Sequence, residues 1–264
     1  MNGIFSTPLK FFNYFRSFHR KIVFIALLYY MLINAVICTR STKKVSQTTD
    51  SLVKYFSGCG IKVYLLGNQS SIFKAYKRAY DAINPDRDDV IIFCHDDIEI
   101  RDNPEEFVEK IKKLTMLPET GFIGPAGTTH LSQNAVWWDQ HLWKAGKHRG
   151  HVWHIDKMGK EYSTYYGEPD DVLALDGLFL AAKAKVIENV GLEKPEYFEG
   201  EWDFYDIFYT FQTYLKGLKN LTLPIHIRHE SVGEIAGRDS WHENRVSFLN
   251  RFGTYLPAHI TAPQ

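Results

Sequence analysis

Two adjacent carboxylates, Asp96 and Asp97, interrupt an apolar stretch between Val90 and Ile100. The five residues before His95 form a continuous apolar run of mainly β-branched and aromatic side chains, which predicts a strand buried on both faces. In open α/β sheets, ligands bind at the carboxyl ends of such strands. Two acids there suit a divalent cation that holds phosphate oxygens, because hard cations prefer oxygen ligands. The alternative is a strand that ends in a solvated acidic turn, and this stretch alone leaves both interpretations open.

Two further strands are expected before this one, at residues 33–38 (INAVIC) and 61–66 (IKVYLL). Helices with an apolar stripe are expected in between, at residues 46–56 and 71–83. Three strands that alternate with two helices predict a parallel sheet with right-handed crossovers and helices on both faces. The predicted fold class is therefore α/β, with a mostly parallel, Rossmann-like sheet in a single domain.

The chain continues this alternation less regularly after the acidic pair. Asn103 is expected to cap a helix that has Pro104 in its first position. Residues 128–166 look like a long, loop-rich excursion with pieces of strand, and such a loop inside a compact domain is usually functional. The other expected elements are strands at 122–126, 172–175, 178–182 and 223–227 and helices at 186–190, 201–216 and 241–252.

The composition limits the classes of partner and compartment. The chain has 264 residues, enough for one sizeable core, and its formal net charge of zero gives no support to a nucleic-acid partner. Its three cysteines, Cys38, Cys59 and Cys94, have no metal-ligand spacing. We interpret them as buried free thiols in a reducing compartment, which favours a cytoplasmic protein.

Residues 1–30 differ from the rest, because aromatic and basic side chains alternate there before an apolar run that starts at Ile22. If residues 33–38 form a strand, too few apolar residues remain to cross a bilayer. Three interpretations stay open: an interfacial helix on a membrane, a short signal-anchor, or an extension without structural role. We favour the first or the third, and we predict an N-terminal extension over residues 1–30 and a globular domain over residues 31–264.

The ordered set of motifs resembles family 2 glycosyltransferases of the GT-A fold, in the branch with an HDD form of the DxD motif. The resemblance covers Leu32 to Pro257 and rests on these stretches, in chain order: INAVICTR, FCHDDIEI, GPAGTTHL with WW soon after, LALDGLFLA, and FYDIFYTFQTYLKG leading into IHIRHESVG. It implies an inverting transferase that moves a sugar from a nucleotide-diphosphate sugar to an acceptor hydroxyl. It also implies a glycan or glycolipid acceptor and a role in bacterial surface polysaccharide or lipopolysaccharide assembly, with peripheral contact to the inner membrane.

The resemblance implies a divalent cation, Mn or Mg, that holds the diphosphate as it leaves, by Lewis-acid stabilisation. Asp97 is the expected metal ligand, with Asp96 as a supporting acid. His229 resembles the second ligand of the family, although a histidine that merely ends a strand is the alternative. His95 stands where relatives usually have an acid that touches the ribose, so this position departs from the family pattern.

The nucleotide pocket is expected at the carboxyl ends of the first two strands. Thr39 and Arg40 follow the first strand and would line the pocket by topology. Asn68 follows the second strand, where the family usually has an acid that recognises the base.

The resemblance assigns the catalytic base to Asp206, at the start of a helix. Tyr205 stands where relatives often have an acid, which is a second departure. Asp203 and Glu201 are rivals, and Asp203 shares a helix face with Asp206 at a spacing of three. The alternative is that Asp203 caps the helix and Asp206 lies on the surface.

Acceptor or sugar binding is expected at two places. Asp176 and Gly177 follow a strand, and the glycine would allow close approach of the backbone to a sugar; a plain β-turn is the alternative. Trp137 and Trp138 could form a platform for the acceptor sugar, but buried tryptophans are more often core residues.

Two rival functions remain. One is a non-catalytic carbohydrate or nucleotide-sugar binding protein on a degenerate GT-A scaffold, which the departures at His95, Tyr205 and Phe208 favour. The other is a nucleotidyltransferase, which would need a glycine-rich basic loop after the first strand. The stretch CTRSTKK has the basic charge but no glycine.

Overall fold

The computed structural model describes residues 31–156, 158–230 and 239–260. The chain separates into two units, Met1–Leu32 and Ile33–Gln264, of which the second is described here. The extension expected over residues 1–30, with its interfacial helix or signal-anchor, lies outside the described residues. Within the described ranges, no helix is both long and apolar enough to cross a membrane.

A seven-stranded sheet forms the centre of the second unit, in the order β10-β13-β5-β12-β3-β1-β2. β1, β2, β3, β5 and β13 run in one direction and β12 and β10 in the other, which confirms the predicted mostly parallel sheet. The bounds of these strands are Ile33–Thr39 (β1), Lys62–Gly67 (β2), Val90–Cys94 (β3), Thr120–Gly124 (β5), Asp171–Val172 (β10), Phe179–Lys183 (β12) and Lys219–Thr222 (β13).

One face of this sheet is covered by α2 (Gln47–Gly58) and α4 (Pro104–Thr115). Phe56 of α2 packs against Phe107 of α4, and Phe107 packs against Phe179 of β12 in the sheet. Asn103 caps α4, as predicted, by accepting a hydrogen bond from the backbone N–H of the second helical residue.

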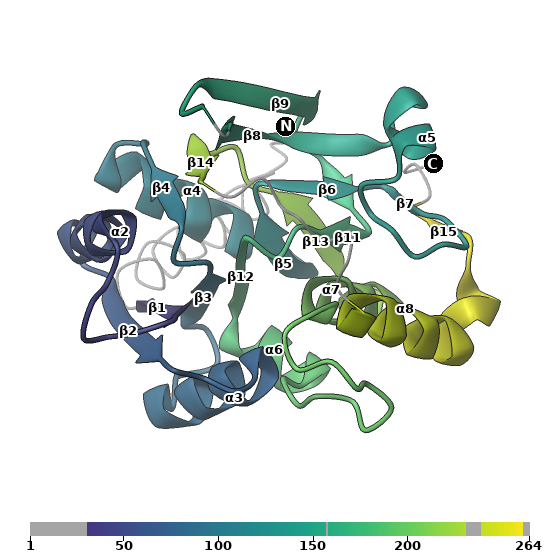
Figure 1. The fold of residues 1–264 in the computed structure, drawn as a ribbon, viewed down its shortest axis with the longest axis horizontal. Helices are drawn as coiled ribbons and strands as arrows, with labels where there is room; N and C mark the ends of the chain where they lie inside the picture. Colours follow the sequence, from purple (N-terminus) through teal and green to yellow (C-terminus); the bar gives the residue numbers. More distant parts are fainter. Residues whose placement is uncertain (1–30, 157, 231–238, 261–264) are drawn as a thin grey trace, which may run out of the picture. The chain divides into compact units, whose positions relative to one another are not determined.

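The other face is covered by α3 (Ile72–Ile83), α6 (Ala184–Val190) and α7 (Tyr205–Leu215) (Figure 1). Tyr76 of α3 lies with its ring centroid 4.4 Å from that of Phe93 in β3. Both faces of the sheet are therefore buried, which explains why its strands read as continuous apolar runs.

A second sheet has the order β11-β6-β8-β14-β4, with β9 paired to β8, and β8 and β9 run along the top of Figure 1. This sheet was not predicted. Its strands are Ile98–Ile100 (β4), Ala126–Thr128 (β6), His148–Ile155 (β8), Glu161–Gly167 (β9), Ala174–Leu175 (β11) and Ile227–His229 (β14). The remaining elements are β7 (His130–Leu131), which pairs with β15 (Ala258–His259), and α5 (Gln140–Lys144), α8 (Asp239–Phe252) and a 3-10 turn (Gly253–Tyr255).

Four predicted elements need correction. The strand predicted at 122–126 is interrupted at Pro125 and divides into β5 and β6, which belong to different sheets. The strand predicted at 223–227 is wrong: the chain leaves β13 at Thr222 and enters β14 at Ile227, and Pro224 between them has no N–H for a sheet. The strand predicted at 172–175 divides into β10 and β11, which belong to different sheets. The helix predicted from residue 201 begins only at Tyr205.

The two sheets meet at the carboxyl end of β3. The segment 95–97 connects β3 of the first sheet to β4 of the second, and the segment 176–178 connects β11 of the second sheet to β12 of the first. The N–H of His95 donates a hydrogen bond to the carbonyl of Leu178 at 3.0 Å, so the two connections lie side by side. The fold therefore places both expected functional turns at one point.

Candidate functional site

His95, Asp97 and His229 form a cluster at this junction. β14 pairs antiparallel to β4 with His229 opposite Ile98, and the N–H of Glu230 donates to the carbonyl of Asp97 at 2.9 Å. The Nε2 atom of His229 consequently lies 3.2 Å from Oδ1 of Asp97, and Nδ1 of His95 lies 3.8 Å from the same oxygen. All three potential ligand atoms lie within 4.8 Å of one another.

Asp97 and His229 form an ion pair within this cluster. Burial favours a higher pKa for Asp97, but the neighbouring histidines outweigh it and hold the pKa of Asp97 below its usual value. Burial likewise favours a lower pKa for His229, but Asp97 outweighs it and the pKa of His229 is raised. Oδ1 of Asp97 is buried and, among the described residues, makes no hydrogen bond of good geometry. Two imidazole nitrogens around such a carboxylate oxygen are a donor set that divalent transition metals accept.

Asp206 lies on the other side of the segment 176–178, in the first turn of α7. Its Oδ2 accepts a hydrogen bond from the N–H of Gly177 at 3.2 Å, while Oδ1 of Asp176 accepts one from the N–H of Leu178 at 3.1 Å. Burial, and then the charge of Asp176, raise the pKa of Asp206 to about 7. A half-buried carboxylate that exchanges its proton near neutral pH is suited to act as a general base.

The residue before α7 has an unusual backbone. Phe204 has φ = 70°, in the left-handed region that bulky side chains avoid. Its side chain is 2% exposed, with ring centroids 5.5 Å from Trp241 and 5.2 Å from Phe248 in α8. Packing against α8 therefore holds a strained turn that sets where α7 begins and where Asp206 points.

Asp203, the rival base, is not on the helix. It is 6% exposed, and its Oδ2 accepts a hydrogen bond from the hydroxyl of Ser240 in α8 at 2.6 Å. The expected shared helix face with Asp206 is therefore wrong, because α7 begins two residues after Asp203. Glu201, the other rival, instead lies 3.2 Å from Lys194 in an ion pair.

The residues expected around the nucleotide lie together at the carboxyl ends of β1, β2 and β3. The N–H of Asn68 donates to the carbonyl of Thr39 at 3.2 Å, and Arg40 follows on the exposed side. The carbonyl of Asp96 accepts a hydrogen bond from the hydroxyl of Thr49 in α2 at 3.0 Å, which anchors the acidic turn to that helix.

The two tryptophans of the expected acceptor platform differ. Trp137 is 4% exposed and packs against Trp138 and Tyr166, so it is a core residue whose ring faces are not available to a sugar. Trp138 is half-buried, and its ring centroid lies 5.4 Å from that of Trp241, which itself contacts Phe204. Trp138 therefore remains a candidate near the start of α7.

One side chain near the site, Tyr205, was missed in the sequence as a candidate for a role. Tyr205 links the two halves of the site, since its hydroxyl lies 3.0 Å from Nε2 of His95 and 2.9 Å from the carbonyl oxygen of Gly177. Sequence comparison showed Tyr205 only as a departure from an acid.

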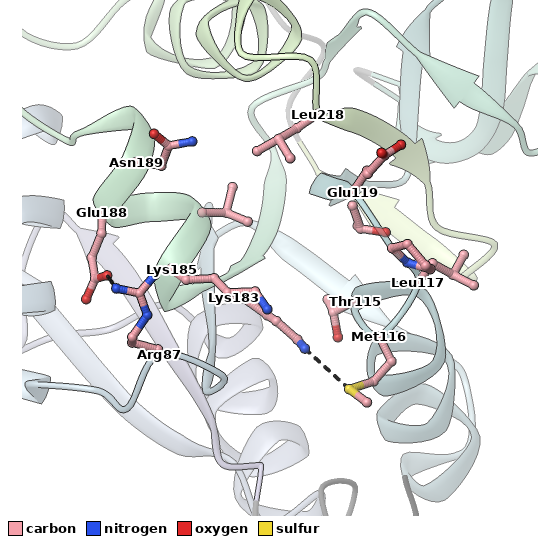
Figure 2. Close-up of a pocket in the computed structure, with 13 residues that line it drawn as sticks. Arg87, Thr115, Met116, Leu117, Glu119, Lys183, Lys185, Glu188, Asn189 and Leu218 are labelled. Carbon is pink, nitrogen blue, oxygen red and sulfur yellow. Dashed lines mark hydrogen bonds and ion pairs between the residues drawn. The ribbon is translucent and has the colours of Figure 1, made fainter. Parts of the chain in front are cut away.

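A pocket of about 550 Å³ lies at the opposite end of the central sheet (Figure 2). Lys183 lines it and pairs in the sheet with Val90, the first residue of β3, whereas the cluster follows the last residue of that strand. Figure 2 shows Lys183 directed at Met116, with Nζ 3.3 Å from Sδ, and Arg87 beside Glu188. The pocket thus lies at the amino ends of the parallel strands, away from the edge where α/β sheets bind ligands.

Most of the chain matches a known protein family. Residues 35–250 match the family described as "Glycosyltransferase like family". The streptomycin biosynthesis protein StrF of Streptomyces griseus is 29% identical over 144 residues, which cover 53% of this chain and 47% of that protein. The chain thus matches about half the length of this curated relative.

Two solved structures show weak likeness. The structure of A197 from STIV has 12% sequence identity and a TM-score of 0.45, and the match covers 76% of this chain and 86% of that one. A glycosyltransferase involved in the glycosylation of the major capsid of PBCV-1 has 9% identity and a TM-score of 0.24, over 39% of this chain and 52% of that one. At these TM-scores, neither likeness carries an argument.

Proposed function

The chain belongs to the glycosyltransferase-like family, and on that premise we propose that it is an inverting, cation-dependent glycosyltransferase. Its donor is a nucleotide-diphosphate sugar and its acceptor is a hydroxyl of a glycan or glycolipid. The observation that carries this proposal is the position of Asp206, which has a pKa of about 7 and holds the N–H of Gly177 beside the cluster of His95, Asp97 and His229.

Asp206 takes the proton of the acceptor hydroxyl. The acceptor oxygen then forms a bond to the anomeric carbon from the face opposite the leaving group. The bond between that carbon and the diphosphate oxygen breaks, and its electron pair leaves on the diphosphate. A single displacement of this kind inverts the anomeric configuration.

Asp97 and His229 would hold the divalent cation, with His95 beside them. When bound, the cation supplies Lewis-acid stabilisation of the diphosphate as its negative charge grows. Near this cluster, the charge of His229 also limits the rise in the pKa of Asp176, which burial causes. Asp176 therefore stands between the cation ligands and the base, where it suits a contact with the transferred sugar.

The remaining side chains divide between donor and acceptor. Thr39, Arg40, Asn68 and Asp96 lie at the ends of neighbouring strands and line the nucleotide side. Asp176 and Gly177 face the sugar, and Trp138 is the residue of the expected aromatic pair that is left for the acceptor.

For the biological setting we propose only a class of pathway and a location in the cell. The family and the name of StrF, a biosynthesis protein, support a biosynthetic transferase, and assembly of surface glycan or lipopolysaccharide is the proposed pathway class. Residues 1–30 form an extension before the catalytic domain of residues 31–264 and contact the cytoplasmic face of the inner membrane through their basic and aromatic side chains.

A thermal-shift screen of nucleotide-diphosphate sugars with and without Mn²⁺ tests this function, because a ligand that binds the folded state raises the melting temperature. We expect one nucleotide class to stabilise the protein in the presence of Mn²⁺. The stabilising donor should then release its nucleoside diphosphate when acceptor glycans are added. Binding without any release, across donors and acceptors, would favour the non-catalytic binding protein instead.

A further inference from the structure

We propose that Tyr205 is a positioning residue that fixes the tautomer of His95, so that Nδ1 of His95 joins Asp97 and His229 as a third metal ligand. This inference rests on the proposed function, because it assumes that the cluster holds a cation. It assigns one linked role to the two positions, His95 and Tyr205, at which the chain departs from the pattern of its relatives.

The hydrogen bonds of Tyr205 determine where its proton points. The carbonyl oxygen of Gly177 can only accept, and it lies 2.9 Å from the hydroxyl, so Tyr205 donates its single proton to Gly177. The same hydroxyl lies 3.0 Å from Nε2 of His95. Since the hydroxyl proton is already used, the Tyr205 oxygen accepts, and Nε2 of His95 must carry the hydrogen.

The tautomer determines what the other ring nitrogen can do. A neutral imidazole with hydrogen on Nε2 has a lone pair on Nδ1. In this structure Nδ1 of His95 faces Oδ1 of Asp97 at 3.8 Å, and the ring centroids of His95 and His229 lie 5.5 Å apart. The lone pair is therefore presented where Asp97 and His229 present theirs. Histidines that bind metals commonly donate their other N–H to an orienting acceptor, which is the part that Tyr205 plays here.

Tyr205 itself is held firmly. Its ring is 6% exposed and contacts Phe73, Tyr76 and Tyr209 edge-on. A β-carbon at Gly177 would lie 2.6 Å from the Tyr205 hydroxyl, so only glycine permits this approach. The hydroxyl is thus fixed in position by packing and cannot follow a displaced imidazole.

The donor set also predicts which metal is preferred. Two imidazole nitrogens and one carboxylate oxygen suit transition metals better than Mg²⁺, which prefers oxygen ligands. We expect Mn²⁺ to bind more than about tenfold more tightly than Mg²⁺ to the full chain without any nucleotide. Mn²⁺ and Mg²⁺ binding of equal strength would contradict a nitrogen-rich site.

The first test measures Mn²⁺ affinity by the electron paramagnetic resonance signal of free Mn²⁺. Tyr205→Phe keeps the ring and removes the hydroxyl, and we expect its affinity to fall about 10- to 100-fold, as for other residues that orient metal ligands. Tyr209→Phe is the matched control, because Tyr209 lies in the same helix and donates its buried hydroxyl to the carbonyl of Leu192 at 2.9 Å. We expect Tyr209→Phe to bind Mn²⁺ within about twofold of the wild type, as the hydroxyl it loses orients no metal ligand.

The second test measures the tautomer directly, by ¹⁵N shifts of the imidazole rings in the metal-free protein above the titration range of histidine. We expect His95 to carry hydrogen on Nε2 in the wild type and to lose this preference in Tyr205→Phe. His95→Gln assigns the signals. It also keeps an amide near Tyr205 while removing Nδ1, and it should weaken Mn²⁺ binding more than about tenfold.

These results separate the inference from the function on which it rests. If Asp97→Ala loses Mn²⁺ affinity while Tyr205→Phe and His95→Gln bind like the wild type, this inference is wrong and the cation site stands without His95. If Asp97→Ala binds Mn²⁺ like the wild type, the cation site of the proposed function fails. If Tyr205→Phe does not fold, hydrogen on Nδ1 of wild-type His95 would still overturn the inference.

Discussion

The two ends of the central sheet carry charged side chains in opposite arrangements. At the amino ends of the parallel strands, Lys183 and Lys185 both lie 3.1 Å from Asp88, so unlike charges are paired. At the carboxyl ends, Asp176 stands close enough to Asp206 for its charge to raise the pKa of that carboxyl. The amino end therefore pairs a carboxylate with two lysines, whereas the carboxyl end brings two carboxyl groups close together.

This difference shows in the titration of the two regions. Although burial opposes it, pairing with Lys183 and Lys185 lowers the pKa of Asp88, which favours its ionised form in the folded protein. Burial and Asp176 raise the pKa of Asp206 to about 7, so its ionised form is disfavoured in the fold. Groups with disfavoured charge are common at sites that do chemistry, and paired groups are common where the fold is stabilised. The described pocket is thus at the end with the paired charges, and the groups suited to chemistry are at the other.

Replacement of the base should have the largest effect. Asp206→Asn keeps an oxygen that can accept from the N–H of Gly177 but cannot take a proton. We expect sugar transfer to fall by about 10²- to 10⁴-fold, the usual contribution of a general base. Donor affinity should stay within about threefold, because the donor is held by other groups.

Asp203→Asn is the matched control for this variant. Asp203 is a buried acid two residues before α7, and its carboxylate accepts a hydrogen bond from Ser240. We expect its transfer rate to stay close to that of the wild type. Equal losses in the two variants would remove the reason for assigning the base to Asp206.

Removal of the cation ligand should have the next largest effect. Asp97→Ala takes away the only carboxylate oxygen in the cluster of the described residues and leaves His229 without its ion pair. We expect Mn²⁺ affinity to fall more than about 100-fold, beyond the loss typical of residues that merely orient ligands. Isothermal titration of Mn²⁺ into the metal-free protein measures it.

Asp88→Ala is the control at the other end of the sheet. It removes one carboxylate of the same size from the neighbourhood of the pocket, so Mn²⁺ binding should not change. A loss in Asp88→Ala as large as in Asp97→Ala would mean that acidity in general, and not this cluster, determines metal binding.

The stability of the fold should depend on pH through Asp206. Its folded pKa of about 7 lies above the ordinary value of 3.8, so between these values the folded protein keeps a proton that the unfolded chain releases. The contribution of Asp206 is complete below pH 3.8 and is lost as the pH rises towards 7. A shift of one pKa unit corresponds to about 1.4 kcal/mol in the free energy of unfolding. Because Asp176 titrates together with Asp206, we expect the free energy of unfolding to fall by about 2 kcal/mol.

Urea unfolding of the wild type and Asp206→Asn at pH 5 and pH 8, with a chelator present, measures this contribution. The wild type should lose stability relative to Asp206→Asn on going from pH 5 to pH 8. Stability differences that are the same at both pH values would show that Asp206 has an ordinary pKa.

A substitution at the amino ends of the parallel strands should have the smallest effect, and it should change stability only. The side chain of Lys183 is 8% exposed, and Asp88→Asn leaves its charge with a weaker partner. We expect the free energy of unfolding to fall by about 1 kcal/mol, since Asp88 is half exposed and such pairs are screened. Thermal unfolding measures this loss, and transfer activity should be unchanged. A loss of transfer without loss of stability would mean that the pocket takes part in the reaction.

The first half of the fold could be predicted from the sequence. Strands β1 and β3 are buried on both faces, so they appear as apolar runs, and the helices around them have clear stripes and caps such as Ser71 and Asn103. Local signals suffice there because strands and helices alternate regularly along the chain. The position of Asp97 after a buried strand followed from this alternation, whereas the position of Asp206 at the start of a helix came only from the resemblance.

The second sheet could not be predicted in this way. β9 has the sequence EYSTYYG, in which most residues are polar or aromatic and partly exposed, and β4, β11 and β14 are only two or three residues long. β4, β11 and β14 form because partners distant in the sequence pair with them, whereas β9 forms a hairpin with β8. The contact of His229 with Asp97 depends on that pairing, and so does the burial of Trp137.

Tyr205 shows the limit of a comparison of motifs. When each position is compared separately, Tyr205 and His95 each appear as the loss of an acidic residue that relatives have. In the structure the two side chains contact each other, because the turn at residues 176–178 brings the start of α7 against the end of β3. A contact of this kind needs the tertiary arrangement and leaves no periodic signal in the sequence.

Anomalous diffraction from crystals of the full chain, soaked with Mn²⁺ and a nucleoside diphosphate, tests the central claim most directly. The account predicts one strong Mn²⁺ peak within bonding distance of Asp97 and His229, with the diphosphate bound to the same ion at the carboxyl end of β3. An Mn²⁺ peak or a diphosphate beside Lys183 at the amino end of the sheet, and none beside Asp97, would contradict it.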